Sequence, residues 1–221
     1  MTIAHNPPSV TLASLSSNGL APDHCELILG GQKSGKSRRA EQLALQWLQQ
    51  DATHRVVLLA TALAGDAEMA HRIARHQQDR QDCPQLAARL STFEVPHQLA
   101  QAIAQHSYPQ VMVVVDCLTL WLTNWLMPLD TTHQDPAEQD LVKQPPAVTP
   151  FATAQNQLLA ALGQASGPVV LVSNEIGLGV VPMGEQVRQF VDALGVLNQQ
   201  VAAVCQRVTF MAAGLPMALK A

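Results

Sequence analysis

The feature that most constrains the fold of this chain is residues 30–37, which have the spacing Gly-x-x-x-x-Gly-Lys-Ser of a phosphate-binding loop. Glycines allow backbone N–H groups to turn inward around an anion, and the N-terminal end of the following helix adds positive potential. We predict that the whole loop contacts a nucleotide: Gly30, Gly31, Gln32, Lys33, Ser34, Gly35, Lys36 and Ser37. Lys36 would place a charge on the outer phosphates, and the Ser37 hydroxyl would ligate Mg²⁺. A Gly-Ser turn that caps a helix is the alternative.

The composition is that of a globular chain with no strong charge bias. The chain has 221 residues, of which 48% are hydrophobic and 14% charged, and its formal charge is −4. This length fits one domain, and the negative charge argues against a nucleic-acid binder. The four cysteines, Cys25, Cys83, Cys117 and Cys205, are widely spaced. Their spacing argues against zinc and disulfide sites and predicts a cytoplasmic protein.

Two observations argue against export and against a membrane span. No Lys or Arg precedes Lys33, so we expect no secretory signal with a basic start. The most apolar stretch, 111–127, is interrupted by Asp116 and Asn124, among other polar residues. That stretch is typical of a strand followed by a buried helix rather than of a membrane span.

Apolar runs alternate with segments of helical periodicity along the chain. We predict strands at 26–30, 55–60, 90–94, 111–115, 168–173 and 207–213, with 217–220 as a candidate last strand, and helices at 36–50, 66–81, 96–106, 118–127, 152–164 and 185–205. This order predicts an α/β fold, P-loop NTPase-like, with a mostly parallel central sheet and helices on both faces. Ligands of such sheets bind at the carboxyl ends of the strands, which places the loop, Thr61, Asp116 and Asn174–Glu175 along one rim.

The domain prediction divides the chain into an arm and one folded unit. Residues 1–24 lack a sustained period and predict a flexible N-terminal arm. Residues 25–221 form the single predicted nucleotide-binding catalytic domain. Within it, 128–150 hold five prolines and predict a mobile insertion.

Asp116 ends the strand predicted at 111–115, where a phosphate-loop protein needs a carboxylate to hold Mg²⁺ and its water shell. Together with Ser37 it is the predicted metal site. A helix N-cap before Leu118 also explains an aspartate at this position.

A basic stripe lies on the helix predicted at 66–81. Arg72, His76 and Arg80 are each one turn apart and share a face. Such a stripe repels itself unless an anion such as a triphosphate lies among its members. Neighbouring arginines would also keep the imidazole neutral, and therefore nucleophilic toward phosphorus. A solvated basic face is the alternative that the spacing alone leaves open.

Residues 26–220 resemble the bifunctional adenosylcobinamide kinase / adenosylcobinamide-phosphate guanylyltransferase family of cobalamin biosynthesis. The resemblance is carried by Gly-Gly-x-x-Ser-Gly-Lys-Ser at 30–37, Ala60-Thr61, Asp66-x-Glu68-Met69-x-x-Arg72-Ile73-x-x-His76-x-x-x-Arg80, Asp116-Cys-Leu-Thr119-x-Trp-Leu-Thr123-Asn124, the run from Val172 to Pro182, and Gly214-Leu-Pro216 with Leu219-Lys220. The chain departs from the pattern at Gln77, where a basic residue is common in the family.

The resemblance implies two reactions on one scaffold. In the first, ATP or GTP phosphorylates adenosylcobinamide. In the second, a histidine attacks the α-phosphorus of GTP and passes GMP to adenosylcobinamide phosphate, which gives adenosylcobinamide-GDP. By position that histidine is His76, with Lys36 as the second catalytic residue. Mg²⁺ is the implied cofactor, and Arg72 and Arg80 are the implied phosphate-stabilising residues.

The family pattern also implies further nucleotide contacts at Ala60, Thr61, Ala62, Gln77, Gln78, Asp79, Arg80, Glu94 and Asp116. Glu94 would accept hydrogen bonds from guanine. The implied partners are small-molecule substrates and further copies of the chain, as a trimer. Two functions remain as alternatives: an ordinary P-loop small-molecule kinase in which His76 is idle, and a nucleotide-gated binding protein.

Overall fold

The computed structural model describes residues 25–65, 67–68, 70–71, 74, 78, 83–127 and 150–221. The predicted arm at 1–24 lies outside the described residues, as does the predicted insertion apart from Pro150, which begins a helix. The elements are β1 (Cys25–Gly30), α1 (Lys36–Gln50), β2 (Arg55–Ala60), α3 (Pro84–Arg89), β3 (Leu90–Glu94), α4 (Leu99–His106), β4 (Val111–Asp116), α5 (Leu118–Leu126), α6 (Pro150–Gly163), β5 (Val169–Val172), α7 (Glu185–Val204), β6 (Arg207–Ala212) and β7 (Leu215–Lys220).

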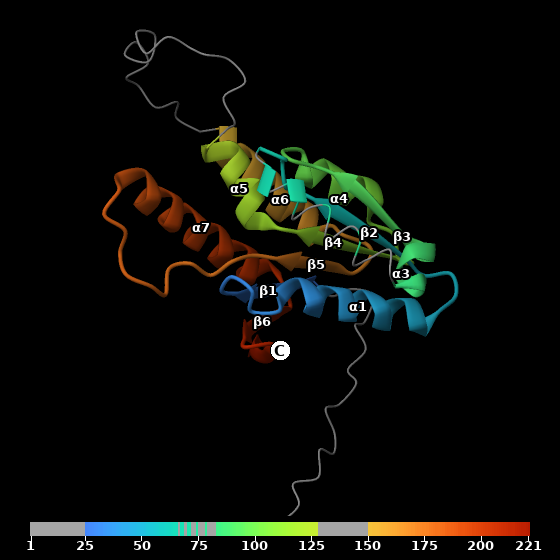
Figure 1. Cartoon of the computed structure of the whole chain (residues 1–221). Helices are drawn as coiled ribbons and strands as arrows, with labels where there is room; N and C mark the ends of the chain where they lie inside the picture. The colour runs from blue at the N-terminus through green and yellow to red at the C-terminus, as the bar shows by residue number, and fades with distance from the viewer. Residues whose placement is uncertain are drawn as a thin grey trace, which may run out of the picture.

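The strands form a seven-stranded sheet with the order β3-β2-β4-β5-β1-β6-β7 (Figure 1). Strands β1 to β6 pair in parallel, and only the edge strand β7 runs antiparallel to its neighbour β6. The central strands β1 and β5 are buried at every position. Burial on both faces explains the apolar run of β5 and, apart from Glu26, that of β1. The predicted mostly parallel sheet is confirmed.

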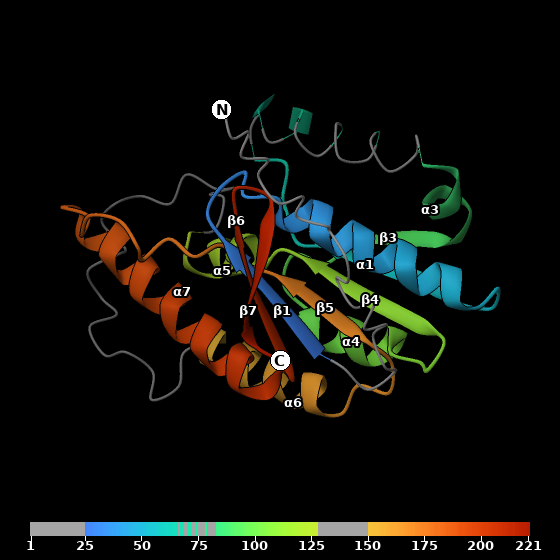
Figure 2. The same cartoon turned by 90° about the horizontal axis from the view of Figure 1, so that it is seen from below.

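Helices cover both faces of this sheet, as predicted (Figures 1 and 2). On one face, α1 and α3 pack on the strands around Ile28, Trp47 and Val114. On the other face, α4, α5, α6 and α7 enclose a larger core that includes Leu59 and Trp121. No helix in the described part of the chain is both long and apolar enough to span a bilayer.

Two helices differ from the sequence prediction. The predicted helix start at Pro96 is wrong, because α4 begins at Leu99. The carbonyl groups of Pro96 and His97 instead accept hydrogen bonds from the side chains of Asn124 and Trp121 on α5.

The short helix α3 was not predicted, although its first residue is Pro84, a residue suited to a helix start. Within the helix predicted at 66–81, the six described residues, between 67 and 78, are helical and exposed.

A buried carboxylate ties α1 and β6 to the first strand. Glu26 on β1 is fully buried and accepts a hydrogen bond of 2.8 Å from the Thr209 hydroxyl. The guanidinium groups of Arg39 and Arg207 approach its two carboxylate oxygens at 3.8 and 3.9 Å. A buried carboxylate is costly unless it is paired, so these two cations hold α1 and β6 against the start of β1.

We expect the double variant Arg39→Met, Arg207→Met to lose about 3–5 kcal/mol of unfolding free energy, because it leaves the Glu26 charge buried without a cation. Urea denaturation followed by circular dichroism measures the loss. Adding Glu26→Gln to the double variant removes the charge and should restore much of the stability. If the triple variant is no more stable than the double variant, the buried charge is not the cause.

Candidate nucleotide-binding site

The phosphate loop joins β1 to α1 through a backbone that two glycines allow. Gly30 has φ +152° and Gly35 has φ +101°, in the region that disfavours other residues. A Cβ at Gly30 would lie 2.5 Å from the carbonyl oxygen of Met211 and 2.6 Å from the Ser34 hydroxyl. The N–H of Gly214, in the turn between β6 and β7, donates to the Ser34 carbonyl at 3.0 Å. The loop is therefore seated on the β6–β7 turn.

Lys36 is the first residue of α1, and its side chain is largely buried. Its ammonium group donates to the Gly31 carbonyl at 2.7 Å, so it reaches back across the loop. Burial lowers the pKa of Lys36, and the nearby Asp116 carboxylate opposes part of that change. The buried ammonium has little contact with water, so an anion bound in the loop would supply the partner for its charge.

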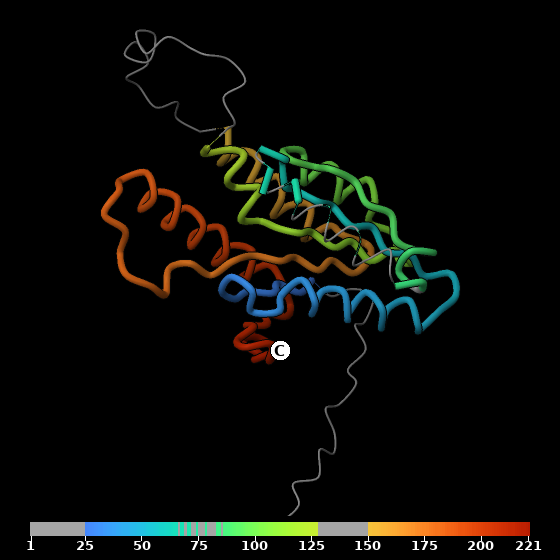
Figure 3. The backbone as a smooth tube through the Cα atoms, viewed as in Figure 1, coloured from blue at the N-terminus to red at the C-terminus, as the bar shows by residue number. Residues whose placement is uncertain are grey.

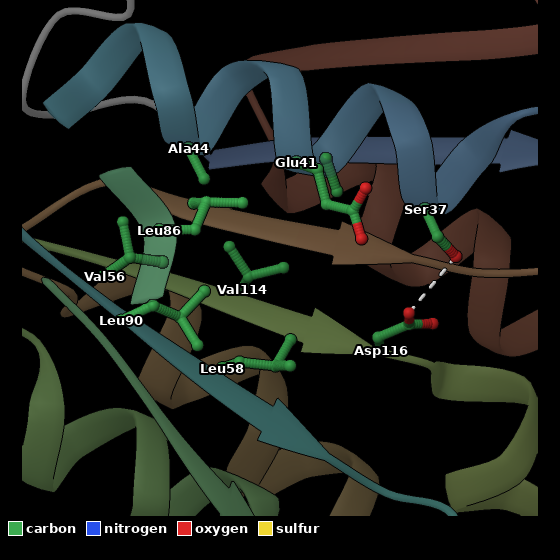
Figure 4. A pocket seen from close by; sticks show the side chains of 10 residues that line it. Ser37, Glu41, Ala44, Val56, Leu58, Leu86, Leu90, Val114 and Asp116 are labelled. Carbon is green, nitrogen blue, oxygen red and sulfur yellow. Dashed lines mark hydrogen bonds between the residues drawn. The ribbon is translucent and has the colours of Figure 1, made fainter. Parts of the chain in front are cut away.

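Ser37 and Asp116 lie at the polar end of a small pocket between α1 and the sheet (Figure 4). The Ser37 hydroxyl donates to the Asp116 carboxylate at 3.2 Å. The described residues hold no group of three or more His, Cys, Asp or Glu side chains that could bind a metal by themselves. One hydroxyl and one carboxylate, both hard oxygen ligands, fit a Mg²⁺ ion that takes its other ligands from water and phosphates. The predicted metal pair is thus brought together.

The carboxyl ends of three adjacent strands are level at this edge. Ala60 on β2 pairs with Glu94 on β3 and with Asp116 on β4. The side chain of Glu94 is exposed, and Ala62 in the following loop is partly exposed. Predicted nucleotide contacts from separate parts of the sequence therefore share one rim with the phosphate loop.

Thr61 is fully buried and supports the end of β4. Its hydroxyl donates to the Cys117 carbonyl at 2.7 Å and accepts from the Cys117 N–H at 2.9 Å. Its own N–H donates to the Asp116 carbonyl at 3.1 Å, and its carbonyl accepts from the Asn124 amide at 2.8 Å. The structure gives Thr61 a role in positioning Asp116, which the sequence analysis did not predict.

Cys117 follows Asp116 and is buried between the sheet and α1. Burial, with the neighbouring Asp116 charge, raises the pKa of its thiol to about 12. A thiol with such a pKa is protonated at neutral pH and is a poor nucleophile. Covalent chemistry at this site would therefore use another residue.

The segment after β5 is fastened to the phosphate loop and to two helices. The Glu175 N–H donates to the Gly30 carbonyl at 3.1 Å. The Asn174 N–H donates to the Thr119 hydroxyl at 2.9 Å, and the Asn198 amide on α7 donates to the Asn174 carbonyl at 3.0 Å. Thr119 was noted in the sequence as a polar residue of the apolar stretch and as part of the resemblance, whereas Asn198 was not singled out. No local sequence signal marks Asn198, because its partner is 24 residues away.

The predicted site residues divide into two groups. The structure brings together the phosphate loop, Ala60, Thr61, Ala62, Glu94 and Asp116 along one edge of the sheet. The other predicted residues, Arg72, His76, Gln77, Asp79 and Arg80, lie outside the described residues, and Gln78 is described as helical and exposed.

A parallel sheet that carries a phosphate loop after β1 and a carboxylate after β4 defines the class of protein as a P-loop nucleotide-binding α/β protein. The same fold occurs in the flagellar accessory protein FlaH of Methanocaldococcus jannaschii, at a TM-score of 0.51 and 12% identity, with 92% of this chain and 81% of that chain covered. Residues 26–219 match the family model for cobinamide kinase / cobinamide phosphate guanyltransferase. The chain belongs to this family.

Two curated relatives extend over nearly the whole of the matched region. The bifunctional adenosylcobalamin biosynthesis protein CobP of Pseudomonas aeruginosa is 44% identical over 195 residues, which are 88% of this chain and 96% of that protein. The bifunctional adenosylcobalamin biosynthesis protein CobU of Escherichia coli is 34% identical over 194 residues, which are 88% of this chain and 98% of that protein. The resemblance stated from the sequence is confirmed.

We expect Lys36→Met to abolish the stabilisation that GTP gives to the protein without lowering the stability of the protein alone. Because burial lowers the pKa of Lys36, the folded state disfavours its charged form relative to the unfolded state, so removing the charge at neutral pH relieves that cost. Wild-type protein at a GTP concentration of 100 Kd should gain about 2.7 kcal/mol. Thermal unfolding with and without GTP and Mg²⁺ measures both quantities. A GTP-induced shift in Lys36→Met equal to that of the wild type would contradict the assignment.

Proposed function

We propose that the protein phosphorylates adenosylcobinamide with ATP or GTP and then transfers GMP from GTP to adenosylcobinamide phosphate. The observation that carries the proposal is the contact of Ser37 with Asp116 beside the buried Lys36, in a chain that belongs to the cobinamide kinase / cobinamide phosphate guanyltransferase family. The loop geometry supports triphosphate binding. The family supports the identity of the acceptor.

In the kinase step, the terminal hydroxyl of the acceptor forms a bond to the γ-phosphorus, and the bond from that phosphorus to the β-phosphate oxygen breaks. The nucleoside diphosphate leaves, and the hydroxyl proton is released. Lys36 and the loop N–H groups would bind the transferred phosphoryl group and orient it. Mg²⁺ held by Ser37 and Asp116 would supply further charge neutralisation on the phosphates.

In the transfer step, the imidazole of His76 forms a P–N bond to the α-phosphorus of GTP, and pyrophosphate leaves. A phosphate oxygen of adenosylcobinamide phosphate then attacks the same phosphorus, and the P–N bond breaks to give adenosylcobinamide-GDP. A phosphoramidate is labile enough to pass its group on. Arg72 and Arg80 would neutralise the phosphates as charge moves to the leaving group.

The remaining proposed contacts would select and orient the nucleotide. Glu94, which is exposed at the end of β3 and level with Ala60 and Asp116, would accept hydrogen bonds from the guanine N1–H and amino group. Ala60–Ala62 and Gln77–Arg80 would contact the nucleotide from the two segments that follow β2. We also place the enzyme in the cytoplasm, since its four cysteines are free thiols.

We expect His76→Ala to form no covalent GMP adduct and to retain phosphorylation of adenosylcobinamide. The protein is incubated with α-labelled GTP and Mg²⁺ and then denatured. Label on the wild type should be acid-labile and alkali-stable, as a phosphoramidate requires. His71→Ala is the matched control, because His71 lies in the same segment and is exposed.

Three results would contradict this assignment. If His76→Ala retains as much label as the wild type, the nucleophile is a residue other than His76. Phosphorylation without any covalent GMP in the wild type would favour an ordinary small-molecule kinase. Tight GTP binding with negligible turnover of adenosylcobinamide would favour a nucleotide-gated binding protein.

We further propose that the protein is a homotrimer, as the resemblance implies. Large apolar side chains that lie exposed in the single chain support self-association, among them Leu126, Met127, Leu215 and Leu219. Light scattering on purified protein should give three times the chain mass of 23.8 kDa. A mass of one chain at micromolar concentration would refute the trimer.

A further inference from the structure

A groove of about 600 Å³ separates the segment that follows β5 from helix α7. We call it the β5–α7 groove. One wall is formed by Ile176, Val180 and Val181 of the connecting segment, and the other by Arg188, Asp192 and Val196 of α7. Its volume lies within the range of about 300–1,000 Å³ that is usual for small-molecule sites. No residue of the groove belongs to the phosphate site described above.

The connecting segment exposes apolar side chains to an unusual degree. Val180 is 95% exposed and Val181 74%, and the neighbouring Leu178 and Met183 are 76% and 97% exposed. Large apolar side chains exposed close together in the sequence are a feature of sites that bind a partner or a ligand. These side chains are not needed for the core, so their apolar character points to a bound molecule.

Glycines leave the groove open. Gly177, Gly179 and Gly195 all line it, and a Cβ added at Gly179 or Gly195 would meet no atom within 4 Å. Gly195 lies inside α7, where glycine is less favourable than alanine. An open face over a helical glycine allows a flat molecule to lie close to the backbone.

The groove also carries polar groups along α7. Arg188 holds the connecting segment in place, because its guanidinium donates to the Pro182 carbonyl at 3.1 Å and to the Met183 carbonyl. Asp192 and Gln199 line the same side of the groove. Apolar walls with a row of hydrogen-bonding groups suit a ligand with an apolar face and a polar edge.

The segment that forms one wall of the groove begins at the phosphate site. The connecting segment starts at Asn174 and Glu175, and the Glu175 N–H donates to the carbonyl of Gly30 in the phosphate loop. Figure 3 shows the backbone leaving β5 at the edge where the phosphate loop lies and then running to the start of α7. A molecule seated in the groove can therefore extend one end toward the terminal phosphate of a bound nucleotide.

We propose that the β5–α7 groove binds the corrin ring of the acceptor, with the apolar walls against the ring and the polar groups of α7 against its amide side chains. This inference rests on the proposed function. A corrin is a flat macrocycle with an apolar face and an edge of amides, which is the chemistry that the walls of the groove complement. Because the reacting hydroxyl is carried on a flexible side chain, the ring binds beside the phosphate site and the hydroxyl reaches into it.

The test is Gly195→Leu, which fills the groove from a position where the added side chain meets no atom and improves helix propensity. The matched control is Gly163→Leu, a helical glycine at the end of α6 whose Cβ would also meet no atom. A second variant, Val181→Ser, removes an exposed apolar contact without filling space. The measurements are KM for adenosylcobinamide, Kd for GTP, covalent GMP formation and mass by light scattering.

We expect Gly195→Leu to raise KM for adenosylcobinamide by roughly tenfold or more, and Val181→Ser by a smaller factor. The Kd for GTP and the amount of covalent GMP should stay within about twofold of the wild type, because neither needs the acceptor. Gly163→Leu should match the wild type in all four measurements.

Each other outcome overturns the inference. An unchanged KM in Gly195→Leu places the ring elsewhere. A change in mass in Gly195→Leu or Val181→Ser makes the groove an interface between copies of the chain. If the wild type does not phosphorylate adenosylcobinamide, the proposed function itself is refuted. This result differs from an unchanged KM in Gly195→Leu, which refutes only the position of the ring.

Discussion

The site depends on the placement of one positive charge, the Lys36 ammonium, below the surface at the start of α1. Burial alone disfavours an ammonium, as the lowered pKa shows. The charge is held there because the loop before it is folded back, so that the Gly31 carbonyl accepts from the side chain. This arrangement would suit a bound phosphate, because the cost of burying the charge would then be met before the nucleotide arrives.

The carboxylate opposite the lysine is positioned by interactions far apart in the sequence. Thr61 holds the backbone of Asp116 and Cys117, and Asn124 on α5 holds Thr61 in turn. The segment after β5 is fixed in the same way by Thr119 and Asn198. These hydrogen bonds favour one geometry, because displacing either segment would leave buried donors and acceptors unpaired.

The sequence predicts those parts of the structure that depend on local patterns. The phosphate loop, the parallel sheet and the position of Asp116 follow from spacing and apolar periodicity, since both reflect short-range geometry. The helix start at Leu99 cannot be predicted from local patterns, because it depends on Asn124 and Trp121 of another helix. The supporting role of Thr61 cannot be predicted in this way either, because its partner Cys117 is 56 residues away. In each case the missing information is a contact across the fold.

The two proposed reactions place a particular demand on acceptor binding. The kinase step needs the acceptor end near the γ-phosphorus, and the second step needs it near the phosphorus of the bound GMP. A ring held in the β5–α7 groove, away from both reacting centres, contributes binding energy that is the same in either step. Only the flexible chain that carries the hydroxyl, and later the phosphate, would then have to move. Under this proposal, a ring site kept apart from the phosphate site would allow one scaffold to serve both transfers.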